Sequence, residues 1–193
     1  MNAPQTWLDL IGATPDNTNT TLLLASQLGA YSRSPQIYRC PADRSVGPVP
    51  GGSSEPRVRS VSMNSYMGER SAPYTSGYRQ FKNLAEIVEP SPRRALVFLD
   101  EREDSINDGW FAIDMNGYDP RTPEGYIIVD YPAAWHNRAG TVSFADGHAE
   151  TRRWKDNRTM PTHRYGVPIA LGQPSPENRD VAWLQERTSR KSL

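Results

Sequence analysis

The chain has 193 residues, with 22 Lys and Arg balanced by 22 Asp and Glu. This length suits one domain with a core of ordinary size, so we predict a single domain over residues 1–193. The interspersed and balanced charge argues against binding to nucleic acid or to an anionic membrane surface. A single cysteine, Cys40, excludes an intramolecular disulfide and leaves a cysteine-based zinc site without thiolate partners.

The first elements are predicted from caps and periodicity. Residues 1–20 read as an irregular lead-in that ends in N-cap residues, and a helix is predicted over 21–31. Its apolar positions Leu24, Leu28 and Tyr31 recur at helical spacing, which predicts that they face the core. Residues 57–63 alternate in polarity as a weak strand would.

The most apolar run, 95–99, predicts a strand buried on both faces, and further strands are predicted at 110–113 and 126–129. Residues 155–193 form a C-terminal extension that ends in a short helix. Ser175 is its predicted N-cap, followed by Pro176 at the first helical position.

A hairpin is predicted between residues 140 and 153. Asp146-Gly147 is the dipeptide of a type I′ turn, and a two-residue loop would place Ala145 opposite His148 and Val142 opposite Thr151. In this register apolar side chains share one face of the ribbon and polar side chains share the other. We therefore assign structural roles to His136, Asp146 and Gly147: His136 fixes the entry to the hairpin, and the other two form its turn.

Known catalytic motifs are absent from the sequence: it has no G-x-S-x-G elbow, no H-E-x-x-H helix and no phosphate-binding or dinucleotide-binding glycine loop. The best remaining candidate is a metal-dependent hydrolase site formed by His136, Asp146 and His148, a set of two imidazoles and one carboxylate. The need for Asp146 at the turn tip weakens this candidate. We therefore predict a protein that is not an enzyme and has no catalytic residues.

An acidic loop follows the apolar strand and is a candidate calcium site. Calcium prefers carboxylate, amide and carbonyl oxygens, and this loop supplies several of them within nine residues. Its spacing differs from that of an EF-hand, and a solvated loop neutralised by nearby arginines is the alternative. The candidate Ca²⁺ ligands are Asp100, Glu101, Asp104, Asn107 and Asp108.

Two further chemistries are considered. Cys40 precedes a proline and no sequence feature links it to a histidine, so it is interpreted as a small buried hydrophobic residue rather than a nucleophile. Trp110, Trp135 and Tyr126 are the candidate aromatic platform of an extracellular glycan- or ligand-binding domain.

The segment from Trp135 to Trp154 resembles a known family. His136, nine residues and Asp146-Gly147 match the C-terminal motif of the prepilin-type, type II secretion pseudopilin-like proteins of planctomycete and verrucomicrobial bacteria. Four other segments resemble the same family in the same order: 37–43, 57–64, 98–101 leading to 106–109, and 180–185. The resemblance covers most of the chain from Trp7 onward.

The resemblance implies a pilin-like α+β domain, with an antiparallel sheet packed against a few short helices and a loop-rich remainder. It implies the globular head of a filament subunit of a type II secretion or type IV pilus-like system, with other pseudopilin subunits and secretion machinery as partners. The parent would be anchored in the inner membrane before assembly, and the head would be periplasmic or extracellular. The family's apolar N-terminal helix is missing from this sequence, so we expect no membrane contact by the chain as given. Either truncation or a misplaced start codon would explain the difference.

Overall fold

The fold was analysed in a computed structural model that describes residues 15–49, 51–68, 74–164 and 167–192. The part of the lead-in before residue 15 lies outside these ranges. The described chain is an α+β domain, as the sequence predicts: a five-stranded sheet, two small two-stranded sheets and three α-helices. Within the described ranges, no helix combines the length and the apolar composition that a membrane crossing needs.

The central sheet has the strand order β5-β3-β4-β7-β8. All neighbours are antiparallel except β3 and β5, which run parallel, so the sheet is mixed. Its strands are β3 (Val61–Asn64), β4 (Leu96–Asp100), β5 (Trp110–Phe111), β7 (Ala139–Phe144) and β8 (Ala149–Arg153). The small sheets pair β1 (Val46–Pro48) with β2 (Ser54–Pro56), and β6 (Ile127–Ile128) with β9 (Gln173–Pro174).

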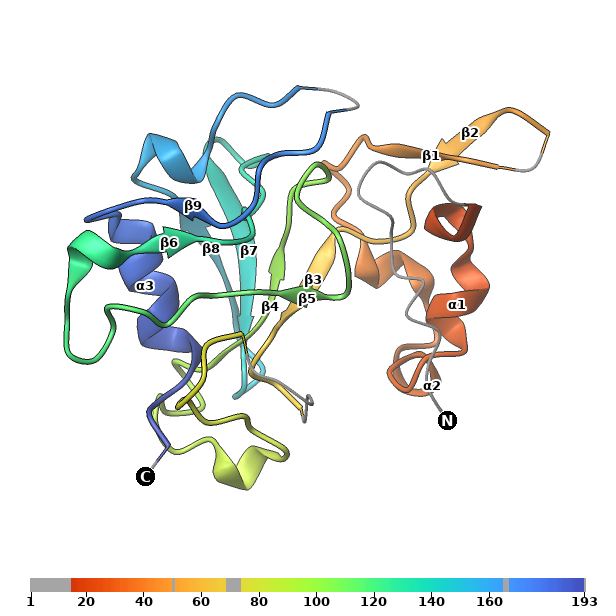
Figure 1. Cartoon of the computed structure of the whole chain (residues 1–193). Coiled ribbons are helices and arrows are strands. Elements are labelled where there is room, and N and C mark those ends of the chain that lie inside the picture. The colour runs from red at the N-terminus through yellow and green to blue at the C-terminus, as the bar shows by residue number, and fades with distance from the viewer. Residues whose placement is uncertain (1–14, 50, 69–73, 165–166, 193) are drawn as a thin grey trace.

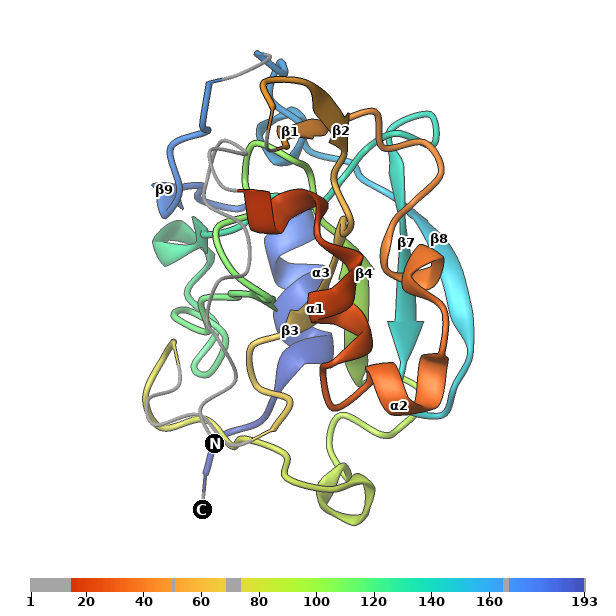
Figure 2. The ribbon, with the colours of Figure 1, turned by 90° about the vertical axis from the view of Figure 1, so that its right-hand side faces the viewer.

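The helices lie on opposite sides of the central sheet. Figure 1 shows α3 (Arg179–Thr188) on one side, and α1 (Thr20–Leu24) and α2 (Gly29–Ser32) on the other, and the turned view of Figure 2 agrees. Val181 and Leu184 of α3 are buried. The helix begins later than predicted, however, because Asn178 rather than Ser175 caps it by accepting hydrogen bonds from the amides of Asp180 and Val181.

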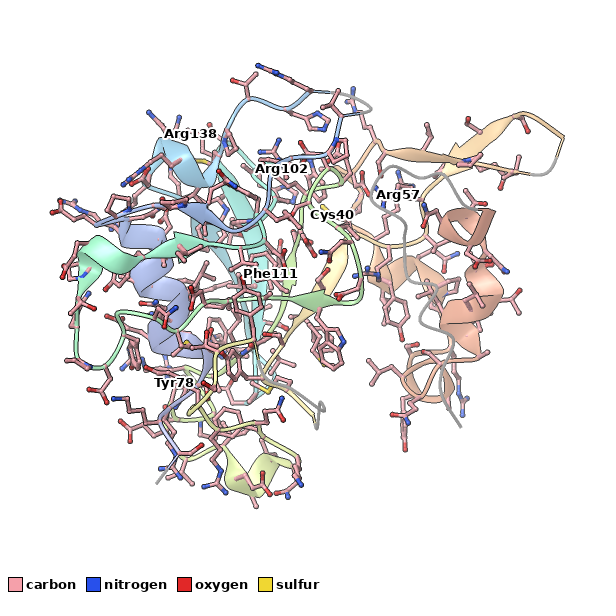
Figure 3. The ribbon with its side chains drawn as sticks, in the orientation of Figure 1. Cys40, Arg57, Tyr78, Arg102, Phe111 and Arg138 are labelled. Carbon is pink, nitrogen blue, oxygen red and sulfur yellow. The ribbon has the colours of Figure 1, made fainter. Side chains whose placement is uncertain are left out.

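The main core fills the space between the sheet and α3. A register shift in β4 brings Leu96 opposite Phe144 and Leu99 opposite Val142, so four apolar side chains share one face. They pack with Phe111, which Figure 3 labels near the centre of the molecule. The other members of this core are Tyr66, Tyr78, Ile113, Met115, Trp154 and Leu184.

The N-terminal helix differs from the prediction. Residues 25–28 interrupt it, and the three side chains predicted to face the core are exposed: Leu24 by 44%, Leu28 by 45% and Tyr31 by 87%. The corner between α1 and α2 is tight, since a Cβ on Gly29 would lie 2.3 Å from the carbonyl oxygen of Leu24. The apolar residues have helical spacing, but within the described part of the chain this segment lies away from the main core and the three side chains stay exposed.

The hairpin of β7 and β8 is present, but the predicted register is wrong by one residue. Val142 pairs with Glu150, and the loop has three residues, closed by hydrogen bonds between Phe144 and His148 and between Gly147 N–H and the Phe144 carbonyl. Gly147 has φ +91°, as a three-residue loop with glycine at its last position requires. The expected sorting by polarity fails because the edge strand β8 is exposed at four of its five residues.

Candidate functional site

Three strand ends meet at one end of the central sheet. Because β4 and β7 are antiparallel, the end of β4 with Asp100 lies beside the chain that enters β7, where His136 is found. The start of β3 lies at the same end, since Val61 pairs with Asp100. The topology thus gathers residues from distant parts of the chain at one place.

Cys40 is fixed at this end of the sheet by its backbone. Its amide donates a hydrogen bond to Ser60 Oγ (2.8 Å), and the Ser60 amide donates to the Tyr38 carbonyl (2.9 Å). These bonds tie the loop after the 3₁₀ turn Pro35–Tyr38 to the residue before β3. Figure 3 shows Cys40 between the sheet and the N-terminal helices.

His136 is positioned by a turn that leads into β7. Its amide donates to the Ala139 carbonyl (3.0 Å), and Asn137 and Arg138 have positive φ angles of 55° and 66°. Left-handed backbone is costly for residues other than glycine, so the turn is held by its surroundings. One such contact is the hydrogen bond from the Trp154 amide to the Arg138 carbonyl (2.9 Å).

Cys40, Asp100 and His136 form a side-chain cluster, called here the sheet-end cluster. Cys40 Sγ lies 3.2 Å from His136 Nε2, and Asp100 Oδ2 lies 4.0 Å from the same nitrogen. One donor atom from each residue lies within 4.8 Å of the other two, and no other His, Cys, Asp or Glu group of three does so in the described ranges. Cys40 is thus buried, as the sequence interpretation expected, and it also contacts His136, which no sequence feature indicated.

The two acids of the sheet-end cluster are buried, whereas the histidine is partly open. Burial raises the pKa of Cys40 above its ordinary value, and the nearby carboxylates of Asp100 and Asp43 raise it further, against an opposing effect of the amides of Ala42 and Asp43. Burial also raises the pKa of Asp100, opposed mainly by the hydrogen bond from the Thr141 amide (2.9 Å). The His136 side chain keeps 38% of its surface exposed.

The sheet-end cluster does not have the geometry of a catalytic triad, in which a nucleophile, a base and an acid that orients the base lie in a row. In such a relay, the acid binds the imidazole nitrogen opposite the nucleophile. Here the thiol and the carboxylate both approach Nε2, and among the described residues no hydrogen-bond partner is seen at Nδ1. Instead, Cys40 Sγ, Asp100 Oδ2 and His136 Nε2 all lie close to one another.

Glu101, the neighbour of Asp100, belongs to a separate buried network. Its carboxylate accepts hydrogen bonds from Ser62 Oγ (2.5 Å) and Ser105 Oγ (2.9 Å). Burial, followed by the charge of Asp130, raises its pKa well above the ordinary value. Burial lowers the pKa of Arg59 to about 10, although the charge of Glu101 acts in the opposite direction. This network joins the loop after β4 to β3.

The five candidate calcium ligands are directed to different partners. Asp100 lies in the sheet-end cluster and Glu101 in the network with Ser62 and Ser105. Asp104 forms a two-point ion pair with Arg102 (2.5 and 2.8 Å), and Asp108 Oδ1 accepts a hydrogen bond from the Trp110 amide (2.6 Å). Asn107 is exposed. The structure therefore does not bring these five side chains together.

The residues of the proposed hydrolase site are also separated. His136 precedes β7, while Asp146 and His148 follow it, so the strand lies between them. Asp146 Oδ1 instead accepts a hydrogen bond from the His148 amide (3.2 Å) and lies 2.5 Å from His148 Nδ1. Asp146 and Gly147 thus occupy the turn, as the sequence interpretation assigned them.

The aromatic residues of the candidate glycan platform are not equally accessible. Tyr126 is 2% exposed and packs in a small core with Ile128, Tyr131 and Val181, so it offers no free ring face. Trp110 and Trp135 are each half-buried.

Comparisons with protein-family models, with curated proteins and with solved structures gave no match. No local pattern marks Cys40 as part of a site. A sequence signal exists only for the other two residues. If the strand that ends at Asp100 pairs antiparallel with the strand that follows His136, these two residues become neighbours.

Proposed function

We propose that this chain is the globular head of a pseudopilin-like filament subunit that acts through protein contacts. The proposal is supported by the series of sequence segments that resemble this family and by the α+β class of the domain. Its partners would be other pseudopilin or pilin-like subunits and secretion machinery. Its location would be periplasmic or at the cell surface, with the parent subunit anchored in the inner membrane before assembly.

The observation that carries the proposal is the exposed apolar surface of the N-terminal segment. It consists of Leu24, Leu28, Tyr31 and Ile37, called here the N-terminal apolar residues. Leu24 lies on α1, Leu28 is the N-cap of α2, Tyr31 lies on α2 and Ile37 on the following 3₁₀ turn, and these three elements contact one another.

Exposed apolar side chains grouped on one region are typical of protein interaction sites, and tyrosine is enriched in such interfaces. The helices α1 and α2 lie on the side of the sheet opposite α3 (Figure 2). In a pilin-like subunit the N-terminal helix leads into the filament core, so surfaces near the start of the head are suited to contact neighbouring subunits. We therefore assign this region to contacts between subunits.

Self-association of the purified chain tests this assignment. We expect sedimentation velocity to show association that increases with concentration, and we expect Leu28→Asp/Tyr31→Asp to reduce it because a charge must be desolvated in the contact. The matched control is Leu84→Asp/Val88→Asp, since these residues are also exposed, by 61% and 64%, but lie elsewhere. A wild-type chain that remains monomeric, or two double variants that behave alike, would contradict the assignment.

The gene offers a second test, of the family itself. We expect the reading frame upstream of the first codon to encode a basic leader followed by about 20 apolar residues. An in-frame stop codon directly upstream, without such a segment, would refute the filament-subunit proposal.

A further inference from the structure

The donor atoms of the sheet-end cluster are spaced as metal ligands are. Zinc bonds of about 2.3 Å to sulfur and about 2.0–2.1 Å to nitrogen place two tetrahedral ligands about 3.5 Å apart. The observed separations, 3.2 Å between Cys40 Sγ and His136 Nε2 and 4.0 Å between His136 Nε2 and Asp100 Oδ2, lie on either side of this value. All three donor atoms lie within 4.8 Å of one another.

We infer that Cys40, Asp100 and His136 bind one divalent transition-metal ion of the zinc class. The donors are one thiolate sulfur, one imidazole nitrogen and one carboxylate oxygen. Sulfur and imidazole donors select zinc and related ions, whereas calcium and magnesium require oxygen ligands throughout. The chemistry of the site therefore differs from that predicted for the acidic loop.

Hydrogen bonds that involve backbone amides position two of the three ligands, Cys40 and Asp100. Ser60 Oγ accepts the amide hydrogen of Cys40, and the amide of Thr141 donates to Asp100 Oδ2. Burial raises the pKa of Cys40, and the amides of Ala42 and Asp43 oppose that rise without cancelling it. Outer partners of this kind orient metal ligands and contribute to their affinity.

Three protein ligands leave a tetrahedral ion with one further position. The Cys40 residue is 7% exposed and the Asp100 side chain 5%, but the His136 side chain is 38% exposed, so solvent reaches the cluster from the side of the histidine. Water would complete the coordination in the isolated chain. A side chain of a neighbouring subunit could replace that water in an assembly, but the metal site itself does not depend on the proposed function.

The competing interpretation is a thiol–imidazole hydrogen bond with no ion. The two interpretations differ in a spectroscopic signature, because a cobalt ion bound by a thiolate absorbs in the near ultraviolet by charge transfer from sulfur. Cobalt(II) is a suitable probe since it accepts the same donors in the same tetrahedral geometry as zinc. The chain contains one cysteine, so this absorption would identify Cys40 as the ligand.

The experiment is a cobalt titration of the untagged, reduced chain, followed by displacement with zinc. We expect one cobalt ion per chain, with thiolate charge-transfer absorption that disappears when zinc is added. Cys40→Ser should abolish the absorption, and His136→Gln and Asp100→Asn should each prevent saturation at a cobalt concentration that fills the wild-type site. Ser60→Ala retains all three ligands and should weaken binding by about 10-fold with an unchanged spectrum.

The two remaining histidines provide the controls. His163 Nε2 lies 3.3 Å from Glu103 Oε1, and His148 pairs with Asp146, so each is an imidazole beside a carboxylate without a thiol. His163→Gln and His148→Gln should bind cobalt as the wild type does. The inference is overturned if the wild-type chain shows no thiolate charge-transfer absorption, or if binding depends on His163 instead. The test for thiolate charge-transfer absorption uses the wild-type chain, so it stands even if a variant fails to fold.

Discussion

The two ends of strand β7 have different kinds of surroundings. At its start, His136 meets Cys40 and Asp100, which are distant in sequence and buried. At its end, Asp146 and Gly147 form an exposed turn whose side-chain contacts are local. The His-x9-Asp-Gly spacing thus covers one strand with a side-chain cluster at one end and a turn at the other.

This difference shows how a motif of fixed spacing can be mistaken for a single site. A strand of six residues spans about 20 Å, so groups at its two ends cannot share one ion or one small molecule. The spacing instead sets the length of the strand between two features that must each be in place. Predictions for the two ends can therefore be made separately.

The largest expected effect concerns the glycine at the start of β7. A Cβ on Gly140 would lie 2.7 Å from the carbonyl oxygen of Ala133, a backbone atom that cannot easily move. We expect Gly140→Ala to lower the free energy of unfolding by about 2–4 kcal/mol, measured by urea denaturation. Gly109→Ala is the control, because a Cβ there meets no atom within 4 Å. Equal stability of the two variants would show that the short distance to the Ala133 carbonyl does not exclude a side chain at position 140.

Metal addition is expected to have the next largest effect. Zinc at 100 times its dissociation constant should stabilise the native chain by about 2.7 kcal/mol, whereas calcium at the same concentration should leave the melting temperature unchanged. The expectation follows from the thiolate and imidazole donors at the start of β7 and from the divergence of the acidic loop. A melting temperature that rises with calcium and not with zinc would favour the acidic loop as the metal site and contradict the zinc-class site.

A smaller effect is expected at the turn. Gly147 has φ +91° but open space around its Cα, so a side chain is opposed by backbone conformation and not by a clash. Gly147→Ala should lower the free energy of unfolding by about 1–2 kcal/mol, and Gly147→Val by more, because a β-branched residue resists positive φ. If Gly147→Val unfolds at the same urea concentration as the wild type, the turn does not require glycine.

The smallest effect is expected for Asp146. The hydrogen bond from His148 lowers the pKa of this carboxyl group. A lowered pKa in the folded state stabilises the protein above the unfolded pKa of about 3.9, and the contribution is lost as the pH falls below that value. Asp146→Asn should therefore have a slightly lower melting temperature than the wild type at pH 7, and the difference should vanish in acid. A difference that grows in acid would contradict this origin.

The sequence predicts those parts of the fold where a local pattern matches a buried face. The α+β class, the apolar strand β4 and the C-terminal helix α3 are of this kind. The stripe of Leu24, Leu28 and Tyr31 has equally clear spacing, yet spacing alone cannot tell whether another element covers it.

Two further features, the hairpin register and the contact of Cys40 with His136, could not be predicted for related reasons. The hairpin register depends on whether Ala145 belongs to the loop. The polarity pattern favoured the two-residue loop, but most of the edge strand β8 is exposed, so the burial of one face does not enforce that register. Cys40 reaches His136 across 96 positions of sequence only because of strand pairing and the hydrogen bond to Ser60. Contacts of this kind depend on the tertiary fold and have no local signature.

The separation of the two ends of β7 is tested most directly by the zinc-induced rise in melting temperature of two variants of the motif. His136→Gln and Asp146→Asn are matched, since each replaces one motif side chain by an amide of similar size. We predict that the rise is lost in His136→Gln and retained in Asp146→Asn. A rise that is lost in both variants, or in Asp146→Asn alone, would show that the motif acts as a single site and would contradict this account.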